Sequence, residues 1–316
     1  MTTTTRAPSQ PATASELAVP LRRRPRVRPG RAAAWALLAV LIFVSLFPFW
    51  WMIKEALTHN KYLFGDFGLW PQHPTLVNFE RVLGLATPAE QQAEFPNEVI
   101  QLKFLSNLVN SVIFTTVVAI GSVAFSSLSA FAFARLRWRG RDLIFGAFLA
   151  GLMVPPIFGV LPNFILMKEL GWIYTWQGLI APYLLMQPFA VFFLRQFFLN
   201  IPDEIEDAAK IDGLGPWGLF RQICLPMSRA PIATLLTIQA VFAWNEYLWP
   251  QLITTTGHAQ PLTAALGYFV RSSPTVARDW TAFMAATAIS VVPLVIFMLI
   301  FGRRLVTNLQ FAGGGK

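Results

Sequence analysis

Four acidic side chains lie close together in a polar segment of this 316-residue chain. They are Asp203, Glu204, Glu206 and Asp207. Negative charge is favoured in the first turns of a helix, because the helix dipole is positive there. Asn200 precedes the acids as a candidate N-cap, and Gly213 suits the left-handed position that closes a helix. The pattern predicts a short helix between these two residues.

This polar segment, residues 200–229, has the features of a docking site for another protein. A second short helix is expected from Pro216 to Pro226. On the first helix, one face is narrow, small and only partly apolar, so it would make a poor core face. That face is predicted to hold Ile205, Ala208, Ala209 and Asp212. A helix resting on lipid headgroups is the alternative, but an anionic leaflet would repel the four acids.

Other side chains that could act in catalysis or bind a metal are far apart. His59, His73 and His258 fall in polar loops at wide spacing, where solvated side chains are the simplest interpretation. Cys224 is the single cysteine, which excludes an internal disulfide, and we interpret it as a packing residue. A phosphate-binding Gly-x-x-x-x-Gly-Lys-Ser/Thr sequence is absent. We therefore predict that the chain is not an enzyme and binds no cofactor or metal.

One carboxylate interrupts a long apolar stretch. Glu246 is the only formal charge between Arg229 and Arg271. A charge at the centre of a membrane helix costs about 2.5–3.5 kcal/mol on insertion scales, so a cavity or a hydrogen-bond partner is expected. The candidate solute pathway is Trp244, Asn245, Glu246 and Tyr247. An interfacial aromatic belt with a helix–helix hydrogen bond explains the same residues equally well.

The elements that must position these residues are membrane helices. Hydrophobic residues make up 55% of the chain and charged residues only 13%. Stretches of about 20 mostly apolar residues are long enough to cross a bilayer, and we predict six. They lie at about 33–54, 105–134, 143–166, 176–195, 230–253 and 280–302. Pro155, Pro156 and Pro162 predict a kink in the third, which could line a pathway or serve packing only.

The charge distribution orients the predicted spans. The formal net charge is +9, and the basic residues cluster at the ends of apolar runs, which indicates a bilayer partner and not nucleic acid. Alternating the spans places most basic residues on the side of the amino terminus, so both termini are expected in the cytoplasm. Residues 1–31 are expected to be a disordered basic tail, and residues 32–316 the membrane domain. The loops at 57–103 and 254–279 face the other side.

The polar segment resembles the "EAA" loop of binding-protein-dependent ABC importer permeases. The matching residues are Glu206, Asp207, Ala208, Ala209, Asp212, Gly213, Ile223, Leu225 and Pro226. The family has Glu-Ala-Ala where this chain has Asp207-Ala208-Ala209. The resemblance implies that the segment contains a cytoplasmic coupling helix, which is seated in a cleft of an ATP-binding subunit.

Further segments are similar to the sugar-transporting branch of these permeases, of the maltose and multiple-sugar type. They are Asn110-Ser111, Ala130–Arg137, Leu194–Phe198 and the glycine-rich end at Asn308–Lys316. The resemblance implies an all-α, type I importer permease with six transmembrane helices in a bacterial inner membrane. It also implies two ATP-binding subunits that hold ATP and Mg²⁺, a second related permease, an external solute-binding protein and a sugar substrate. An ion-coupled secondary transporter, or the same role for a non-sugar solute, is the alternative.

Overall fold

The computed structural model describes most of the chain, without the side chains of 32, 272 and 303–313. The described residues are 29–65, 68–71, 73–94, 102–185, 187–254, 258–272 and 279–313. Most of the predicted basic tail and the last three residues of the glycine-rich end lie outside them. Within the described residues the regular structure is helical, with one isolated β-bridge between Thr58 and Pro74. The prediction of an all-α protein is confirmed.

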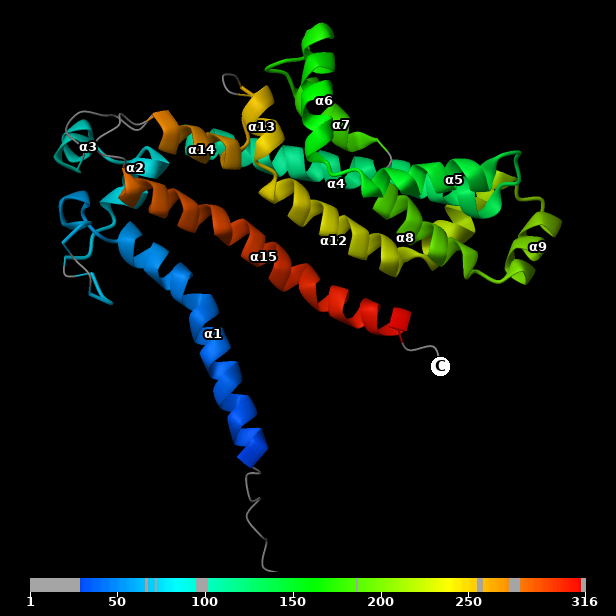
Figure 1. The fold of residues 1–316 in the computed structure, drawn as a ribbon, viewed down its shortest axis with the longest axis horizontal. Coiled ribbons are helices and arrows are strands. Elements are labelled where there is room, and N and C mark those ends of the chain that lie inside the picture. The colour runs from blue at the N-terminus through cyan, green and yellow to red at the C-terminus, as the bar shows by residue number, and fades with distance from the viewer. Residues whose placement is uncertain are drawn as a thin grey trace, which may run out of the picture. The chain divides into compact units, whose positions relative to one another are not determined.

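The helices follow one another with short connections (Figure 1). In chain order they are α1 (Pro29–Ala56), η1 (Asn60–Tyr62), α2 (Val77–Leu83), α3 (Pro88–Glu94), α4 (Phe104–Arg135), α5 (Arg141–Ala150), η2 (Gly151–Met153), α6 (Ile157–Glu169), α7 (Trp176–Leu184), α8 (Pro188–Leu199), α9 (Asp203–Ile211), α10 (Pro216–Gly218), η3 (Leu219–Cys224), α11 (Leu225–Met227), α12 (Arg229–Asn245), α13 (Leu248–Ile253), α14 (Leu262–Ser272) and α15 (Trp280–Gly313). Contacts divide the chain into two compact units, Met1–Pro48 and Phe49–Lys316.

The first unit is described only as the part of α1 that ends at Pro48. Its large apolar side chains are exposed, Phe43 by 68% and Trp35 by 62%. Aqueous exposure of such a row would be unfavourable, because burial of apolar surface gains roughly 25 cal/mol per Å². A lipid environment removes that cost, which agrees with the predicted first span.

In the second unit, α4 is the longest helix without a proline, and it packs against α8 and α12 (Figure 1). Small residues allow this close packing. A side chain at Gly121 would collide with Leu184 of α7, and Ser126 Oγ accepts a hydrogen bond from the Gln187 amide just before α8. The serine satisfies a backbone donor that the break between α7 and α8 leaves without an intrahelical partner.

The apolar core is densest where the end of α4 meets α8 and η3. Its fully buried side chains include Leu194 and Phe198 of α8 and Leu235 of α12. Phe131 of α4 packs on Phe220, with ring centroids 5.2 Å apart. Cys224 lies in the same core and is buried, as predicted for a packing residue.

Among the described residues, three helices are long and apolar enough to cross a membrane: Ala33–Ala56 in α1, α4, and Trp280–Gly302 in α15. The pairs α5–η2 with α6 and α7 with α8 meet the same criterion only if each bent pair counts as one span. The 143–166 stretch is bent by 103°, between α5–η2 and α6. Pro155 and Pro156 lie at this bend, where each lacks a backbone donor, so the predicted kink is confirmed there. The count of six spans stays a prediction.

The predicted span at 230–253 is not one continuous helix. Helix α12 ends at Asn245, and α13 begins at Leu248 after two residues that are not helical. The prediction that Glu246 lies inside a helix was therefore wrong. The Glu246 carboxylate instead caps the start of α13, because Oε1 accepts a hydrogen bond from the Trp249 amide at 3.3 Å.

Candidate functional site

The polar segment forms a short helix, α9, that differs at its start from the prediction. Asn200 closes α8 and does not cap α9, since its amide donates to the Phe197 carbonyl at 3.2 Å. Pro202, in an extended conformation, precedes the first residue of α9, Asp203. The predicted N-cap was wrong because α9 begins at Asp203, two residues later than a cap at Asn200 requires.

The predicted end of α9 is confirmed. Gly213 has a φ of 85°, in the left-handed region that favours glycine. Its amide donates to the Lys210 carbonyl at 3.0 Å, and the Leu214 amide donates to the Ala209 carbonyl at 2.9 Å. This pair of bonds is the Schellman closure, which satisfies carbonyls that the helix end would otherwise leave without a partner.

The second helical stretch begins at Pro216, as predicted, but it does not stop at Pro226. Helices α10, η3 and α11 run on without a break to Met227, and η3 is a π-helix. Pro226 is tolerated because it lies in the first turn of α11, where its missing N–H is least costly. Ile223 and Leu225 pack against the core next to Cys224.

The two alanines of α9 differ in exposure. Ala209 is 5% exposed and belongs to the core, whereas Ala208 is exposed. The predicted stripe of Ile205, Ala208, Ala209 and Asp212 follows helical spacing, but adjacent residues are about 100° apart on a helix, so the stripe extends from the core side of α9 to its solvent side. Asp212 is exposed and Ile205 is half-buried.

Glu206 is turned toward the bundle, where it meets Arg135, the last residue of α4. The Arg135 side chain is 7% exposed and that of Glu206 is 13% exposed. The guanidinium donates to Glu206 Oε2 at 2.9 Å, to Asp203 Oδ1 at 2.8 Å, and to the carbonyls of Phe198 and Ile201. We call these five residues the arginine cluster. It joins the end of α4 to the end of α8 and the start of α9.

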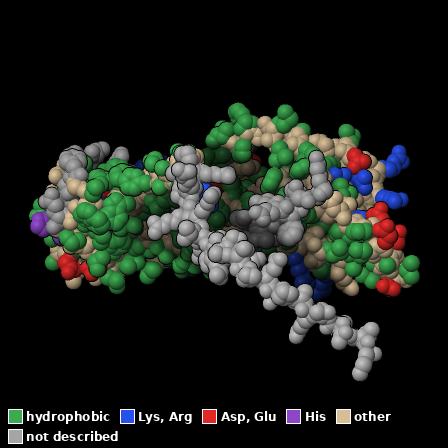
Figure 2. Space-filling model, turned by 90° about the horizontal axis from the view of Figure 1, so that it is seen from below, with side chains coloured by type: hydrophobic (Ala, Val, Ile, Leu, Met, Phe, Trp, Pro, Cys, Tyr) green, Lys and Arg blue, Asp and Glu red, His purple; other side chains and the backbone are tan. Residues whose placement is uncertain are grey.

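Large apolar side chains stand exposed beside this cluster. Ile211, the last residue of α9, is 86% exposed, and Trp217 in α10 is 62% exposed. With Asp207 and Ala208 they make an outward surface, which we call the α9 surface. Figure 2 shows acidic and basic side chains gathered at the end of the molecule where Figure 1 places α9. Aromatic anchors within a polar rim are typical of protein interfaces.

Sequence reasoning did not select Ile211 and Trp217. Their signal was present, since each is a large apolar residue within a segment that is otherwise polar. The arginine cluster had no local signal at all, because Arg135 and Glu206 are separated by 71 positions. Arg135 lies in the Ala130–Arg137 segment and among the basic residues that orient the chain, and neither feature predicts a contact with Glu206.

Burial raises the pKa of the Cys224 thiol to about 11. The Arg135 guanidinium lowers this pKa and the Glu206 carboxylate raises it, both by a smaller amount than burial. The thiol is therefore protonated at neutral pH and a poor nucleophile. The described residues contain no group of three or more His, Cys, Asp and Glu that could hold a metal.

Of the four candidate pathway residues, the structure places one in a cavity. Trp244 lines it, whereas Asn245 donates to the Val241 carbonyl of its own helix at 2.8 Å. Tyr247 lies over Gly267, and its hydroxyl accepts a hydrogen bond from Arg271 at 2.9 Å. Glu246 caps the start of α13 as described above.

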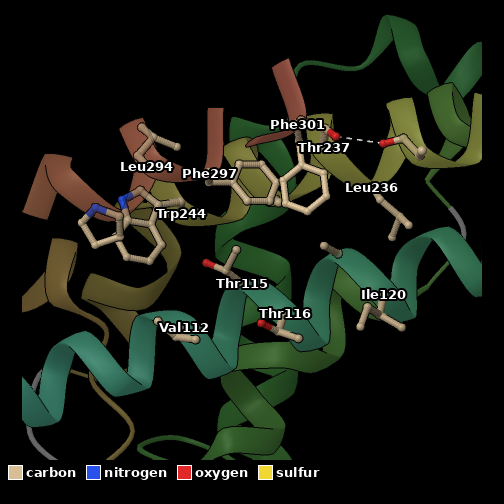
Figure 3. A pocket seen from close by; sticks show the side chains of 14 residues that line it. Val112, Thr115, Thr116, Ile120, Leu236, Thr237, Trp244, Leu294, Phe297 and Phe301 are labelled. Carbon is tan, nitrogen blue, oxygen red and sulfur yellow. Dashed lines mark hydrogen bonds between the residues drawn. The ribbon is translucent and has the colours of Figure 1, made fainter. Parts of the chain in front are cut away.

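The cavity has a volume of about 440 Å³ and lies between α4, α12 and α15 (Figure 3). Its lining consists of Val112, Thr115, Thr116, Ala119, Ile120, Ala233, Leu236, Thr237, Ala240, Trp244, Pro293, Leu294, Phe297 and Phe301. Figure 3 shows Thr115 and Thr116 of α4 on one side and the rings of Phe297 and Phe301 of α15 on the other. The lining includes three threonines and three aromatic rings, and none of these lining residues carries a charge. The Thr237 hydroxyl donates to the Ala233 carbonyl of its own helix at 2.9 Å.

A family model described as "Binding-protein-dependent transport system inner membrane component" matches residues 122–310. The chain is 33% identical over 285 residues to the trehalose transport system permease protein SugB of Mycobacterium tuberculosis, covering 88% of this chain and 96% of that protein. It is 30% identical over 280 residues to the sn-glycerol-3-phosphate transport system permease protein UgpE of Agrobacterium fabrum, covering 88% and 95%.

A solved structure shows the same fold. It is the crystal structure of a bacterial ABC transporter involved in the import of the acidic polysaccharide alginate, and one of its chains matches with a TM-score of 0.73. The match covers 90% of this chain and 99% of that chain, at 19% identity.

Proposed function

Because the chain belongs to the inner membrane components of binding-protein-dependent transport systems, we propose that it forms half of the pathway of an ATP-driven sugar importer. A second, related permease completes the pathway, and an external solute-binding protein delivers the solute. Two copies of a separate subunit hold ATP and Mg²⁺ and hydrolyse the nucleotide. The chain lies in a bacterial inner membrane with both termini in the cytoplasm.

The α9 surface is the proposed contact with the ATP-binding subunit. The single observation that carries this proposal is the exposure of Ile211 and Trp217 beside acidic side chains, outside the apolar helices. A tryptophan that is 62% exposed would be an unusual feature in water, but it becomes the centre of an interface once a partner covers it. Ile223 and Leu225 pack against the apolar core, and Pro226 is half-buried.

A sugar is favoured over a phosphate ester by the chemistry of the cavity. The matched relatives transport trehalose or sn-glycerol 3-phosphate according to their names, so both solute classes need weighing. A phosphate would call for arginine, lysine or clustered amides. The cavity lining offers the ring of Trp244, the hydroxyl of Thr116 and no charged side chain, which suit a neutral polyhydroxylated solute.

Uptake assays in a bacterial strain that lacks this chain separate the candidates. With the wild-type chain restored, labelled trehalose should enter the cells. An excess of unlabelled sn-glycerol 3-phosphate should not reduce the uptake of labelled trehalose. Depletion of ATP by arsenate should stop uptake, while collapse of ion gradients by a protonophore should spare it when ATP is maintained. The reverse pattern of sensitivity would identify an ion-coupled transporter and reject the proposal.

A substitution in the cavity tests whether solute passes there. Trp244→Ala should lower uptake without preventing membrane insertion, because it removes the aromatic face that the cavity presents to a sugar ring. Ile238→Ala on the same helix is the matched control, since Ile238 is 41% exposed and does not line the cavity. Equal uptake by the two variants would exclude Trp244 from the pathway.

A further inference from the structure

Helix α4 connects three parts of the molecule that are far apart in the chain. Its middle, from Val112 to Ile120, forms one side of the cavity. Its first turns contact residues 258–262, and its last residue, Arg135, contacts the start of α9. The helix has no internal proline and is continuous from Phe104 to Arg135, so a displacement at one end is carried to the other.

At the start of α4, neutral side chains bind the backbone of the 258–262 loop. Asn110 Nδ2 donates to the carbonyls of His258 and Gln260 at 2.7 and 3.0 Å, and Asn107 Nδ2 donates to Gln260 at 2.8 Å. Ser111 Oγ accepts from the Leu262 amide at 2.8 Å. We call these contacts the amide cluster.

At the end of α4, Arg135 makes the polar contacts to the start of α9. The attachment to α8 is shared, because Arg195 Nε of α8 donates to the Phe133 carbonyl at 3.2 Å. Arg135 donates from three nitrogens to two carbonyls and two carboxylates, in the arginine cluster. One of these carbonyls, that of Phe198 at the end of α8, also accepts from the Ile201 amide at 3.3 Å. A lysine has one nitrogen and cannot reach so many acceptors at once. Arg137, two residues later, is exposed.

We propose that Arg135 is a positioning residue for coupling: it holds α9 to α4, so that movement of α9 displaces the cavity wall. The inference rests on the proposed function, in which an ATP-binding subunit moves α9. The sequence predicted that Glu206 contacts the ATP-binding subunit. In this proposal Glu206 instead forms an ion pair with Arg135 within the permease chain. Without the contact, the partner still binds the α9 surface, but its movement is no longer transmitted to α4.

The test compares Arg135→Gln, Arg135→Lys and the control Arg137→Gln in the assembled transporter, purified through a tag on this chain. Three quantities are measured: the amount of ATP-binding subunit that co-purifies, the rate of ATP hydrolysis, and the solute taken up per ATP hydrolysed in proteoliposomes. Arg135→Gln should keep the first two and lower the third by about tenfold, a typical size for a coupling effect. Arg135→Lys should fall between, and Arg137→Gln should match the wild type.

The single cysteine gives an independent readout of the contact itself. Cys224 is buried beside Arg135 and Glu206, so N-ethylmaleimide should label it slowly in the wild type and in Arg137→Gln. Labelling should be several-fold faster in Arg135→Gln, because α9 is no longer held over the core. If Cys224 in Arg135→Gln were labelled at the wild-type rate, Arg135 would not hold α9 over the core. This conclusion would stand even if no uptake were measurable.

The outcomes are distinct from failure of the proposed function. If wild-type uptake does not depend on ATP, the proposed function falls, and the labelling rates still decide whether Arg135 holds α9. If uptake per ATP is unchanged in Arg135→Gln, or falls equally in Arg137→Gln, the coupling role is rejected. If Arg135→Gln does not insert, Glu206→Gln replaces it, since that change leaves α4 intact, and normal uptake per ATP in Glu206→Gln would reject the role.

Discussion

The two ends of α4 are both attached to distant parts of the chain, but by different chemistry. The amide cluster at its start uses neutral donors and backbone carbonyls, whereas the arginine cluster at its end uses a buried guanidinium and two carboxylates. Neutral hydrogen bonds are insensitive to ionic strength, while charge pairs near water are screened by it. The amide cluster is suited to a permanent contact. The arginine cluster is suited to a contact that transmits movement between α9 and α4.

Removal of the strongest neutral contact should have the largest effect on stability. Asn110→Leu leaves the carbonyls of His258 and Gln260 with fewer donors, and we expect a loss of about 2 kcal/mol in the free energy of unfolding. Thermal unfolding in detergent measures it. Asn107→Leu is the control and should cost less, about 1 kcal/mol, because Asn110 still serves Gln260. A loss that depends on salt would contradict the neutral character of this cluster.

The charged end should respond next, and in a salt-dependent way. Glu206→Gln should lower the unfolding free energy by about 1–2 kcal/mol at low salt. The loss should be smaller at high salt, because the ion pair with Arg135 is partly exposed to solvent and its ions. Asp203→Asn should cost less than about 0.5 kcal/mol, since the Asp203 side chain is 87% exposed. Equal losses in these two variants would show that burial does not decide the strength of the arginine cluster.

The closure of α9 provides a smaller effect. Gly213→Ala should cost about 1 kcal/mol, because a side chain is disfavoured at positive φ even though nothing lies within 4 Å of the added atom. Gly215→Ala is the control, because the added atom also has nothing within 4 Å but the residue has a φ of −74°. This substitution should leave the free energy of unfolding unchanged. Unfolding curves of the two variants distinguish the strain of a side chain at positive φ from the general effect of replacing a glycine.

The last comparison is a change with pH near the arginine cluster. Burial raises the Cys224 pKa to about 11 from its usual 9.0. The unfolded chain therefore releases its thiol proton first as pH rises, and this group's contribution to stability is lost between about pH 9 and pH 11. The rate of maleimide labelling should rise through the same interval. A plateau already at pH 9 would contradict the burial of the thiol.

Sequence reasoning located the helices where the signal is local. The charge-free run before Arg135 predicted α4, and Gly213 predicted the end of α9, because both depend on residues adjacent in the chain. It failed where distant residues decide the outcome. The break at Glu246 is stabilised partly by Thr263, whose hydroxyl donates to the Glu246 carbonyl at 2.8 Å from another helix.

The direction of side chains on α9 could not be predicted either. Helical periodicity places Glu206 and Ala209 near one face, but which face meets the core is set by Arg135 and Phe198, which come from other helices. The resemblance to the EAA loop selected the segment, and its docking role stays a prediction. The resemblance did not separate the residues that form the outer surface from those, such as Glu206, that hold it in place.

Helix α4 has 32 residues, which at 1.5 Å per residue gives a length of about 48 Å. A hydrocarbon core is about 30 Å thick, so the helix must tilt in the bilayer or extend well beyond it. Lipids with longer or shorter acyl chains then change its tilt and leave its length unaltered. The separation between the amide cluster and Arg135 is consequently set by peptide geometry, and it stays the same in membranes of different thickness.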